Sequence, residues 1–485
     1  MTVRSGPGSP RRDGTELRVE ALPLWRMIMF ALGQFGWSLT AFSVGSILNY
    51  FYFPPIVDGS PAFPIRIFQG AVIGVLTVLG LSSFIGRMFD AVTDPWIAML
   101  SDRSKRPLGR RRFFMLAGAF PAALFSVLVF APPAPGASPL NAVWLVATLL
   151  GFYLFMTIYT IPYGALIPEL GHDSDTRLLL ATLTSITWAV GFFVGNSVYA
   201  LKDLFQSAGL APERALLAVV ALFAAVGFAA MMLPVLFIDE RRFCRKTHSE
   251  EGAVQAIAGA LKNHEFRVVL LGQFAYYAAN AFLEIGIVYY VTILMRLPEA
   301  MAFTLMAVMF VASFALYPAV LAGAKRFGKK NMMVMAFAAQ ALVFAMLGVT
   351  GKVPLISPAA WGWIVIAVQT VPSAVTGILA TAIIADIARA DGVRTGNHKE
   401  AVFYAANNFA MKAAISLSNL VFPSFLLLGR SVDDDLGVRL TSALALVLCV
   451  AASWGFTRYR ESRVEADLAM ETIVIVEAAA KREGA

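Results

Sequence analysis

Three ionisable residues lie at helical spacing inside a long apolar segment. In the segment 86–95 (GRMFDAVTDP), Arg87, Asp90 and Asp94 stand at i, i+3 and i+7. This spacing predicts that a guanidinium group and two carboxylates share one face of a helix. Two carboxylates one turn apart repel each other unless a cation lies between them. The pattern predicts a site for a coupling cation on this helix. The alternative is that Arg87 and Lys412 neutralise the aspartates as interior ion pairs, and both interpretations can hold together.

The composition indicates that this helix lies in a membrane. Hydrophobic residues make up 58% of the 485 residues and charged residues only 14%, whereas a soluble domain has roughly 25% charged residues. The charges gather in short clusters between apolar runs that are long enough to span a bilayer. A charged helix face is costly there, which makes it a functional-site hypothesis. The net charge of +8 is explained by arginine-rich loops without invoking nucleic acid.

Apolar runs fall into two sets of six, separated by a charged interval. The sequence therefore predicts an all-α membrane protein with twelve transmembrane helices in two six-helix bundles. The predicted parts are an N-terminal tail at 1–26, a bundle at 27–238, a linker at 239–265, a bundle at 266–457 and a C-terminal tail at 458–485. A basic turn enters the third run of each half, at 109–111 (GRR) and 328–330 (GKK), as two parallel repeats would place it. The other interpretation is that loops on one side of a membrane are commonly basic.

The distribution of Lys and Arg predicts the orientation. Most of the 39 Lys and Arg residues fall in the two tails and in the loops on the same side as the tails. Such loops face the cytoplasm. We therefore expect a multi-pass protein of the cell membrane (inner or plasma membrane) with both termini in the cytoplasm.

Other polar residues interrupt the apolar runs. Lys412 lies near the middle of the eleventh run with Asn408 on the same helix face, and pairing with the aspartates of the second run is favoured over snorkelling. Thr157 and Thr160 lie in the fourth run; they either line a cavity or bond the carbonyls of their own helix. Glu284 in the seventh run is either a protonated structural residue or a proton or substrate site, and both interpretations remain open.

Motifs of soluble catalysis are missing. The sequence has no Walker loop, no zinc-spaced Cys/His set and no Gly-x-Ser-x-Gly elbow. We expect a protein that is not an enzyme, holds no cofactor and does not couple to ATP within this chain.

The string Arg-x-x-Asp-Ala-x-x-Asp-Pro resembles the major facilitator superfamily, and specifically the glycoside–pentoside–hexuronide:cation symporters typified by the melibiose permease. The basic segment 101–112, the segment 161–170 (IPYGALIPEL), Asp386 and Lys412 extend the resemblance to both halves. The resemblance implies a cation site at Asp90, Thr93, Asp94 and Thr157, with sodium at the two aspartates. Arg87 and Lys412 are the implied charge partners. The implied conformational gate consists of Asp102, Arg103, Arg110, Arg111, Glu169 and Asp386.

The residues at the positions that bind the sugar in the melibiose permease differ in this sequence. Acidic and tryptophan positions of the melibiose permease correspond to Ser38, Thr160 and Gly164, which suggests a substrate unlike melibiose. We expect these residues to line the substrate cavity together with Glu284 and Asn408.

The function that follows from the resemblance is symport coupled to sodium or a proton, with alternating access and a small organic solute of the sugar or glycoside class. The alternative is a sodium-dependent carrier of lysophospholipids or other amphiphiles. From another class, a non-transporting membrane receptor or scaffold on the same fold remains open, as does a proton-coupled exporter. The expected partners are the solute or amphiphile and the lipid bilayer, with no nucleic acid, and the expected state is a monomer.

Overall fold

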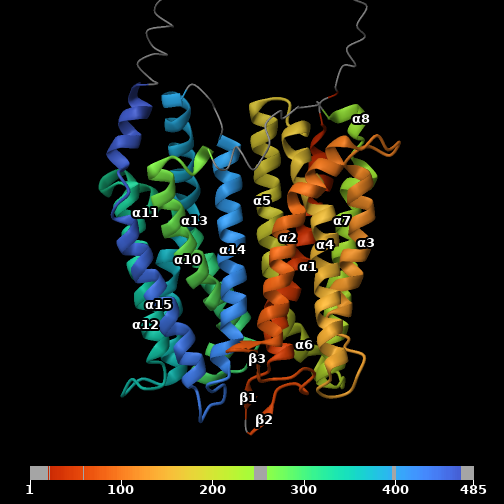
Figure 1. The fold of residues 1–485 in the computed structure, drawn as a ribbon, viewed down its shortest axis with the longest axis vertical. Helices are drawn as coiled ribbons and strands as arrows, with labels where there is room; N and C mark the ends of the chain where they lie inside the picture. The colour runs from red at the N-terminus through yellow and green to blue at the C-terminus, as the bar shows by residue number, and fades with distance from the viewer. Residues whose placement is uncertain (1–19, 21, 58, 245–258, 396–399, 471–485) are drawn as a thin grey trace, which may run out of the picture.

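Two groups of long helices stand side by side in the computed structural model (Figure 1). The structure describes residues 20, 22–57, 59–244, 259–395 and 400–470, so most of both predicted tails and the middle of the predicted linker lie outside it. The N-terminal half contains α1 (Leu24–Tyr52), α2 (Val78–Arg103), α3 (Arg112–Leu128), α4 (Pro139–Leu170), α5 (Ser174–Asn196), α6 (Val198–Ser207), α7 (Pro212–Phe237) and α8 (Glu240–Phe243). The C-terminal half contains α10 (His264–Tyr289), which continues as a π-helix (Tyr290–Leu294), then α11 (Met301–Phe327), α12 (Lys329–Gly348), α13 (Pro358–Thr395), α14 (Glu400–Leu426) and α15 (Leu436–Phe456).

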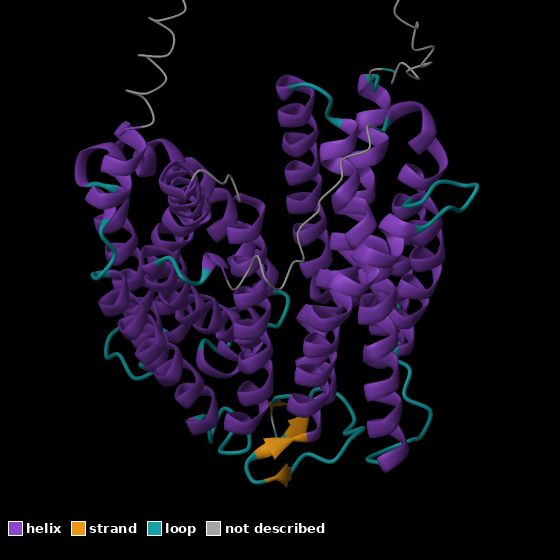
Figure 2. Ribbon diagram, turned by 45° about the horizontal axis from the view of Figure 1, so that its top comes forward, coloured by secondary structure: helices purple, strands orange, loops and turns teal. Residues whose placement is uncertain are grey.

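Four short strands lie at one end of the helices (Figure 2). They follow α1 and form two antiparallel pairs, β1 (Ile56–Val57) with β2 (Ser60–Pro61) and β3 (Ala71–Ile73) with β4 (Leu76–Thr77). We call this end the strand end. The opposite end holds the basic turns at 109–111 and 328–330, and we call it the basic end.

The helices confirm a polytopic fold but not the full predicted count of spans. Within the described residues, nine helices are long and apolar enough to cross a membrane, or ten when α11, which bends by 52°, counts as one span. The helix α2 is not among them, since it carries the charged face that the sequence predicts. The apolar helix α3 has only 17 residues. The two predicted spans without this support are therefore the second and the third.

Contacts between the two halves gather at the strand end. The Tyr289 hydroxyl of α10 donates to the carbonyls of Asn49 and Phe53, at 3.0 Å and 2.7 Å. The guanidinium of Arg430 lies 4.1 Å from the centre of the Phe53 ring. Beside it, the backbone N–H of Ile56 donates to the Arg430 carbonyl at 3.0 Å. The first loop of the N-terminal half is thereby fixed against the C-terminal half.

An ion pair reinforces this closure. Glu299, just before α11, pairs with Lys202 of α6 and accepts a hydrogen bond from the Tyr50 hydroxyl of α1. We call these three residues the strand-end clasp. The side chain of Lys202 is buried. Asp203 of its own half lies 3.7 Å away and is more exposed, so Glu299 of the other half is the closer partner. Removing one member of a buried pair leaves the other charge unsatisfied, which costs roughly 3–5 kcal/mol.

We predict that Lys202→Ala opens the strand end. The variant leaves Glu299 without its cation, so states in which water reaches this carboxylate become favoured. Spin labels at Leu210→Cys and Leu355→Cys, two exposed loop positions in different halves at this end, should show a longer mean separation in Lys202→Ala than in the parent.

Arg66→Ala is the matched control, because Arg66 pairs with Glu213 at 2.6 Å within the N-terminal half. It should leave the label separation unchanged. Both chains carry alanine at Cys244 and Cys449, which are free thiols. An equal separation in the two variants would show that the clasp does not hold the halves together.

Candidate cation site and substrate cavity

Lys412 bridges the two aspartates of α2 from the other half of the molecule. Its Nζ lies 2.9 Å from Asp90 Oδ2 and 2.5 Å from Asp94 Oδ2. The predicted spacing places both carboxylates on the face of α2 that packs against α14. The predicted pairing of Lys412 with these aspartates is therefore present, and it joins the halves in the middle of the helices.

The fourth helix supplies an uncharged oxygen to the same cluster. The Thr157 hydroxyl of α4 donates to Asp90 Oδ1 and lies 3.4 Å from Asp94 Oδ1. Thr93 behaves differently, because its hydroxyl donates to the carbonyls of Phe89 and Asp90 in its own helix, at 3.0 Å and 3.1 Å. Three of the four predicted cation ligands are thus gathered by side-chain contacts, and Thr93 is directed at its own backbone.

Arg87 is held beside this cluster by an aromatic ring. Its guanidinium carbon lies 5.1 Å from the centre of the Tyr153 ring of α4. Gly86 permits this approach, since a Cβ there would come within 2.7 Å of the Tyr153 ring. Arg87 is also within electrostatic range of Asp90 and of Glu284. Its charge therefore acts on a carboxylate of the predicted cation site and on a carboxylate of the other half.

The side chains in contact at this site offer oxygen ligands of the kind that a hard cation prefers. Among the described residues, no three His, Cys, Asp or Glu side chains are close enough to hold a metal together. Two carboxylates and a hydroxyl are hard oxygen ligands, which suit sodium. The two carboxylates of Asp90 and Asp94 share the single ammonium group of Lys412 as their direct partner.

A cavity of about 920 Å³ lies between the halves. It extends toward the basic end, because its wall includes Ile167 in the last turn of α4 and Met333 near the start of α12. The wall is mostly apolar and aromatic. Its aromatic members are Phe42, Trp188, Phe192, Tyr276, Tyr277, Phe310, Phe314 and Tyr317.

Of the five residues expected to line the cavity, only Glu284 lies on its wall. Ser38 is completely buried where α1 meets α5, and a Cβ at Gly191 would come within 1.8 Å of its hydroxyl oxygen. Thr160, Gly164 and Asn408 also lie off the wall, although open space adjoins Gly164. These four residues are therefore not on the cavity wall in this structure, because a spacing shows which face of a helix a residue occupies but not which neighbour covers that face. Their part in substrate binding stays a prediction.

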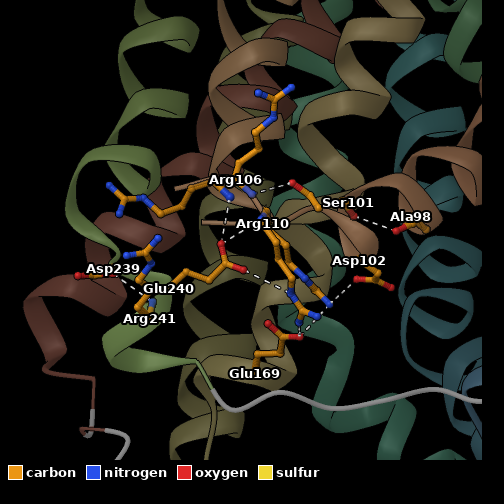
Figure 3. Close-up of polar contacts among 12 residues, drawn as sticks. Ala98, Ser101, Asp102, Arg106, Arg110, Glu169, Asp239, Glu240 and Arg241 are labelled. Atoms are coloured by element: carbon orange, nitrogen blue, oxygen red, sulfur yellow. Dashed lines mark hydrogen bonds and ion pairs between the residues drawn. The ribbon is translucent and has the colours of Figure 1, made fainter. Parts of the chain in front are cut away.

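Four of the six expected gate residues form a network in the N-terminal half at the basic end (Figure 3): Asp102, Arg110, Arg111 and Glu169. Glu169 at the end of α4 pairs with Arg110 and, at 2.8 Å, with Arg111. Arg111 also contacts Asp102 at 3.1 Å. Arg103 is exposed and carries none of the ion pairs of this network.

The C-terminal half has a matching arrangement. Asp386 of α13 pairs with Lys329 at the start of α12, as Glu169 of α4 pairs with Arg110 before α3. The match supports the predicted internal repeat. Because these ion pairs lie within one half each, they do not hold the halves together at the basic end.

Two glutamates that the sequence motifs did not indicate cap the N-terminus of the third helix, one in each half. Glu240 Oε2 accepts from the backbone N–H groups of Arg111 and Arg112, at 2.9 Å and 3.3 Å. Glu461 accepts in the same way from Lys329 and Lys330, at 2.7 Å and 3.0 Å. A carboxylate is favourable at a helix N-terminus, where backbone N–H groups lack partners. The sequence does contain a signal for this role, because each glutamate lies at the same place in its half, just after the last apolar run.

We predict that Gly109→Ala destabilises the N-terminal cap of α3. Gly109 has φ +118°, and a Cβ there would lie 2.5 Å from Glu240 Oε2. Alanine at this position therefore pays a backbone penalty of roughly 1–2 kcal/mol. Its Cβ also displaces the capping carboxylate, which adds to the loss of stability. Gly136→Ala is the control, because Gly136 also has a positive φ, of 74°, but no atom near its Cβ position. A thermal-unfolding midpoint no lower in Gly109→Ala than in Gly136→Ala would contradict this role of Glu240.

Comparison with known proteins places this geometry in a family. The family model described as "MFS/sugar transport protein" matches residues 29–452. The chain belongs to the MFS/sugar transport protein family. The nucleoside transporter NupG, in a mutant form, shares the fold with a TM-score of 0.63 at 12% identity, and the match covers 90% of this chain and 99% of that one.

Individual members of the MFS/sugar transport protein family are distant relatives. An uncharacterized symporter of Synechocystis is 31% identical over 41% of this chain and 34% of its own length. The glucuronide carrier protein homolog of Escherichia coli is 23% identical over 86% of this chain and 90% of its own. The sodium-dependent lysophosphatidylcholine symporter 1-A of Danio rerio is 29% identical over 37% and 31%. The chain spans about a third of the length of the first two curated relatives that it matches.

Proposed function

We propose that this protein is a cation-coupled symporter that moves a small organic solute across the membrane by alternating access. The observation that carries the proposal is the pair of contacts that Lys412 of the C-terminal half makes with Asp90 and Asp94 of the N-terminal half. Two carboxylates at the middle of a membrane helix are costly, at roughly 2.5–3.5 kcal/mol each on the insertion scale. Two carboxylates kept in the membrane at this cost can bind one cation in place of another, which suits the site to ion coupling.

In the proposed mechanism a sodium ion or a proton takes the place of the Lys412 ammonium. The ion enters from the cavity and binds Asp90, Asp94 and Thr157, with Thr93 reoriented toward it. Lys412 then loses its hold on α2, and the mid-helix bridge between the halves is released. Coupling requires that ion and solute raise each other's affinity by the same factor.

The arrangement of the chain in the membrane is part of the proposal. Ten candidate spans together with α2 and α3 give twelve, in two six-helix bundles with the predicted boundaries. The protein then lies in the plasma or inner membrane with both termini in the cytoplasm, and the basic end faces the cytoplasm. The closed strand end and the cavity toward the basic end then correspond to an inward-facing state. The Glu169 and Asp386 networks would act as parts of the gate.

The substrate class that the family favours is a sugar or glycoside. A carrier for lysophospholipids or other amphiphiles is the second candidate, and the mostly apolar and aromatic wall of the cavity favours it. The relative in Danio rerio is named for such a substrate. A receptor or scaffold would need no ion site between its halves and would show no flux.

We predict that Asp90→Asn abolishes the response to the coupling ion. For the purified parent, replacing choline chloride by sodium chloride at equal ionic strength should raise the unfolding midpoint. A ligand at 100 times its Kd stabilises the folded state by about 2.7 kcal/mol. Asp90→Asn should lose this shift, and sodium-driven uptake from a panel of glycosides and lysophospholipids into proteoliposomes should also be lost.

Asp433→Asn is the matched control, since Asp433 is exposed in the loop before α15, and it should keep both responses. If the midpoint follows pH and ignores sodium, the coupling ion is a proton. Unchanged uptake by Asp90→Asn, or no flux of any compound in the parent, would refute symport through this site.

We further predict that Lys412→Ala separates ion binding from transport. Without the ammonium group, the two aspartates no longer have a competitor for the ion, so stabilisation by sodium should appear at a lower sodium concentration. Uptake driven by sodium should fall to the background level, because the bridge between α14 and α2 is gone. A sodium requirement equal to that of the parent would show that Lys412 does not compete for the site.

A further inference from the structure

The wall of the cavity carries a single charged side chain. Of the described residues that line it, Glu284 of α10 alone is an aspartate, glutamate, lysine, arginine or histidine. The rest of the wall is apolar, aromatic or polar without charge. The wall therefore presents one negative charge to a ligand and no positive charge to balance it.

Glu284 has no ion-pair partner of its own. Its side chain is exposed to the cavity, and its Oε1 accepts a hydrogen bond from Asn280 Nδ2 at 2.8 Å. Within the described part of the chain, the ion pairs found do not include Glu284. Arg87 is within electrostatic range, but its guanidinium lies over the Tyr153 ring and Arg87 is not on the cavity wall. A cation that enters the cavity would pair with this carboxylate and keep it ionised.

Four aromatic rings from both halves lie on the same wall. Trp188 and Phe192 of α5 are stacked with centroids 5.8 Å apart. Phe42 of α1 meets these two rings edge to face, at 5.5 Å and 4.7 Å, and Phe192 stacks on Phe310 of α11 at 5.6 Å. We call these four residues the aromatic cluster. The face of an aromatic ring attracts cations, and most strongly that of tryptophan.

Glu284 and the aromatic cluster lie at similar depths in the molecule. The Tyr289 hydroxyl of α10 donates to the carbonyls of Asn49 and Phe53, which fixes α10 level with this part of α1. Glu284 precedes Tyr289 by five residues, whereas Phe42 precedes Asn49 by seven and Phe53 by eleven. The difference of two to six residues corresponds to about 3–9 Å along the helices. One ligand at this depth of the cavity can therefore meet both the carboxylate and the rings.

The lone carboxylate decides which charge an occupant of this cavity should have. A ligand that fills the cavity displaces water from Glu284, and a desolvated charge without a partner is costly. An anionic ligand would add a like charge, and a neutral ligand would leave the carboxylate unbalanced. A cationic ligand supplies the missing partner, and the aromatic cluster attracts the same charge.

We propose that the substrate is an organic cation, an ammonium or quaternary ammonium compound with an apolar body, which pairs with Glu284 and contacts the aromatic cluster. This inference rests on the proposed symport function and names its substrate class, which differs from the sugars that the family favours. The positive charge is a net charge, because the phosphate of a zwitterionic lysophospholipid would find no cationic group on the wall. The coupling ion and the substrate then use carboxylates of different halves, those of Asp90 and Asp94 in α2 and that of Glu284 in α10.

The test compares three ligands with the same aromatic body. They are the cation 4-(hydroxymethyl)phenyltrimethylammonium, its neutral isostere 4-tert-butylbenzyl alcohol and the zwitterion 4-(trimethylammonio)benzoate. Calorimetric titration of the full chain in lipid nanodiscs, with protein-free nanodiscs as the reference, gives the three Kd values. The parent should bind the cation at least about tenfold more tightly than either of the other two, which one close pair of opposite charges readily supplies.

Two variants test the two parts of the site, and a third is the control. Glu284→Gln keeps the shape and removes the charge, so it should bring the ratio of the neutral to the cationic Kd near one by weakening the cation. Trp188→Leu keeps the wall apolar and removes one ring face, so it should reduce the ratio about two- to fivefold. Glu465→Gln, at an exposed position after α15, should leave the ratio unchanged.

Four results would overturn the inference. They are equal affinities for the cation and its neutral isostere, a zwitterion that binds as tightly as the cation, a ratio that Glu284→Gln or Trp188→Leu leaves unchanged, and no binding of the cation at millimolar concentration. The response of the unfolding midpoint to the coupling ion, which Asp90→Asn removes, is measured on the same preparations. If this response persists in the parent while one of the four results occurs, the substrate class is wrong and ion coupling stands. If the response is absent as well, the proposed symport function fails.

Discussion

The structure depends on one electrostatic constraint, which is that Asp90 and Asp94 need a cation in an apolar interior. Among the described residues, the N-terminal half, which carries both aspartates, makes no ion pair with them. Lys412 of α14 supplies the cation from the opposite half, and Thr157 of α4 completes the hydrogen bonding. Because removing one partner of a buried ion pair costs several kcal/mol, these contacts stabilise the packing of α2 against α14. The contact that holds the two halves together in the middle is also the one that the proposed ion exchange would break.

The two ends of the molecule differ in how the halves meet. At the strand end, Tyr289, Glu299 and Arg430 of the C-terminal half contact the N-terminal half directly. At the basic end, Glu169 and Asp386 pair within their own halves. The strand end is thus closed by contacts between the halves. At the basic end, these acidic residues find their ion-pair partners within their own half.

Sequence patterns predicted the charged cluster well because its chemistry is local to the helix face. The spacing of Arg87, Asp90 and Asp94 and the isolated position of Lys412 in an apolar run were enough to pair them. Of the residues expected to line the cavity, its wall contains Glu284 alone, because the wall depends on helix tilt and on close approaches that leave no periodic signal. Ser38 is covered where Gly191 lets α5 approach α1, whereas Trp188 faces open space. The clasp was missed for a related reason, since Lys202 and Glu299 look like ordinary loop charges until the fold brings them together.

The caps formed by Glu240 and Glu461 have a consequence for how the sequence can change. Both carboxylates accept from backbone N–H groups, so they recognise the start of a helix and not the side chains that follow it. Arginine in one half and lysine in the other are accommodated by the same geometry. The capping contacts themselves therefore do not decide whether arginine or lysine supplies the positive charge of these loops, which biases the orientation of a chain during insertion; that choice is left to the ion pairs that the side chains form.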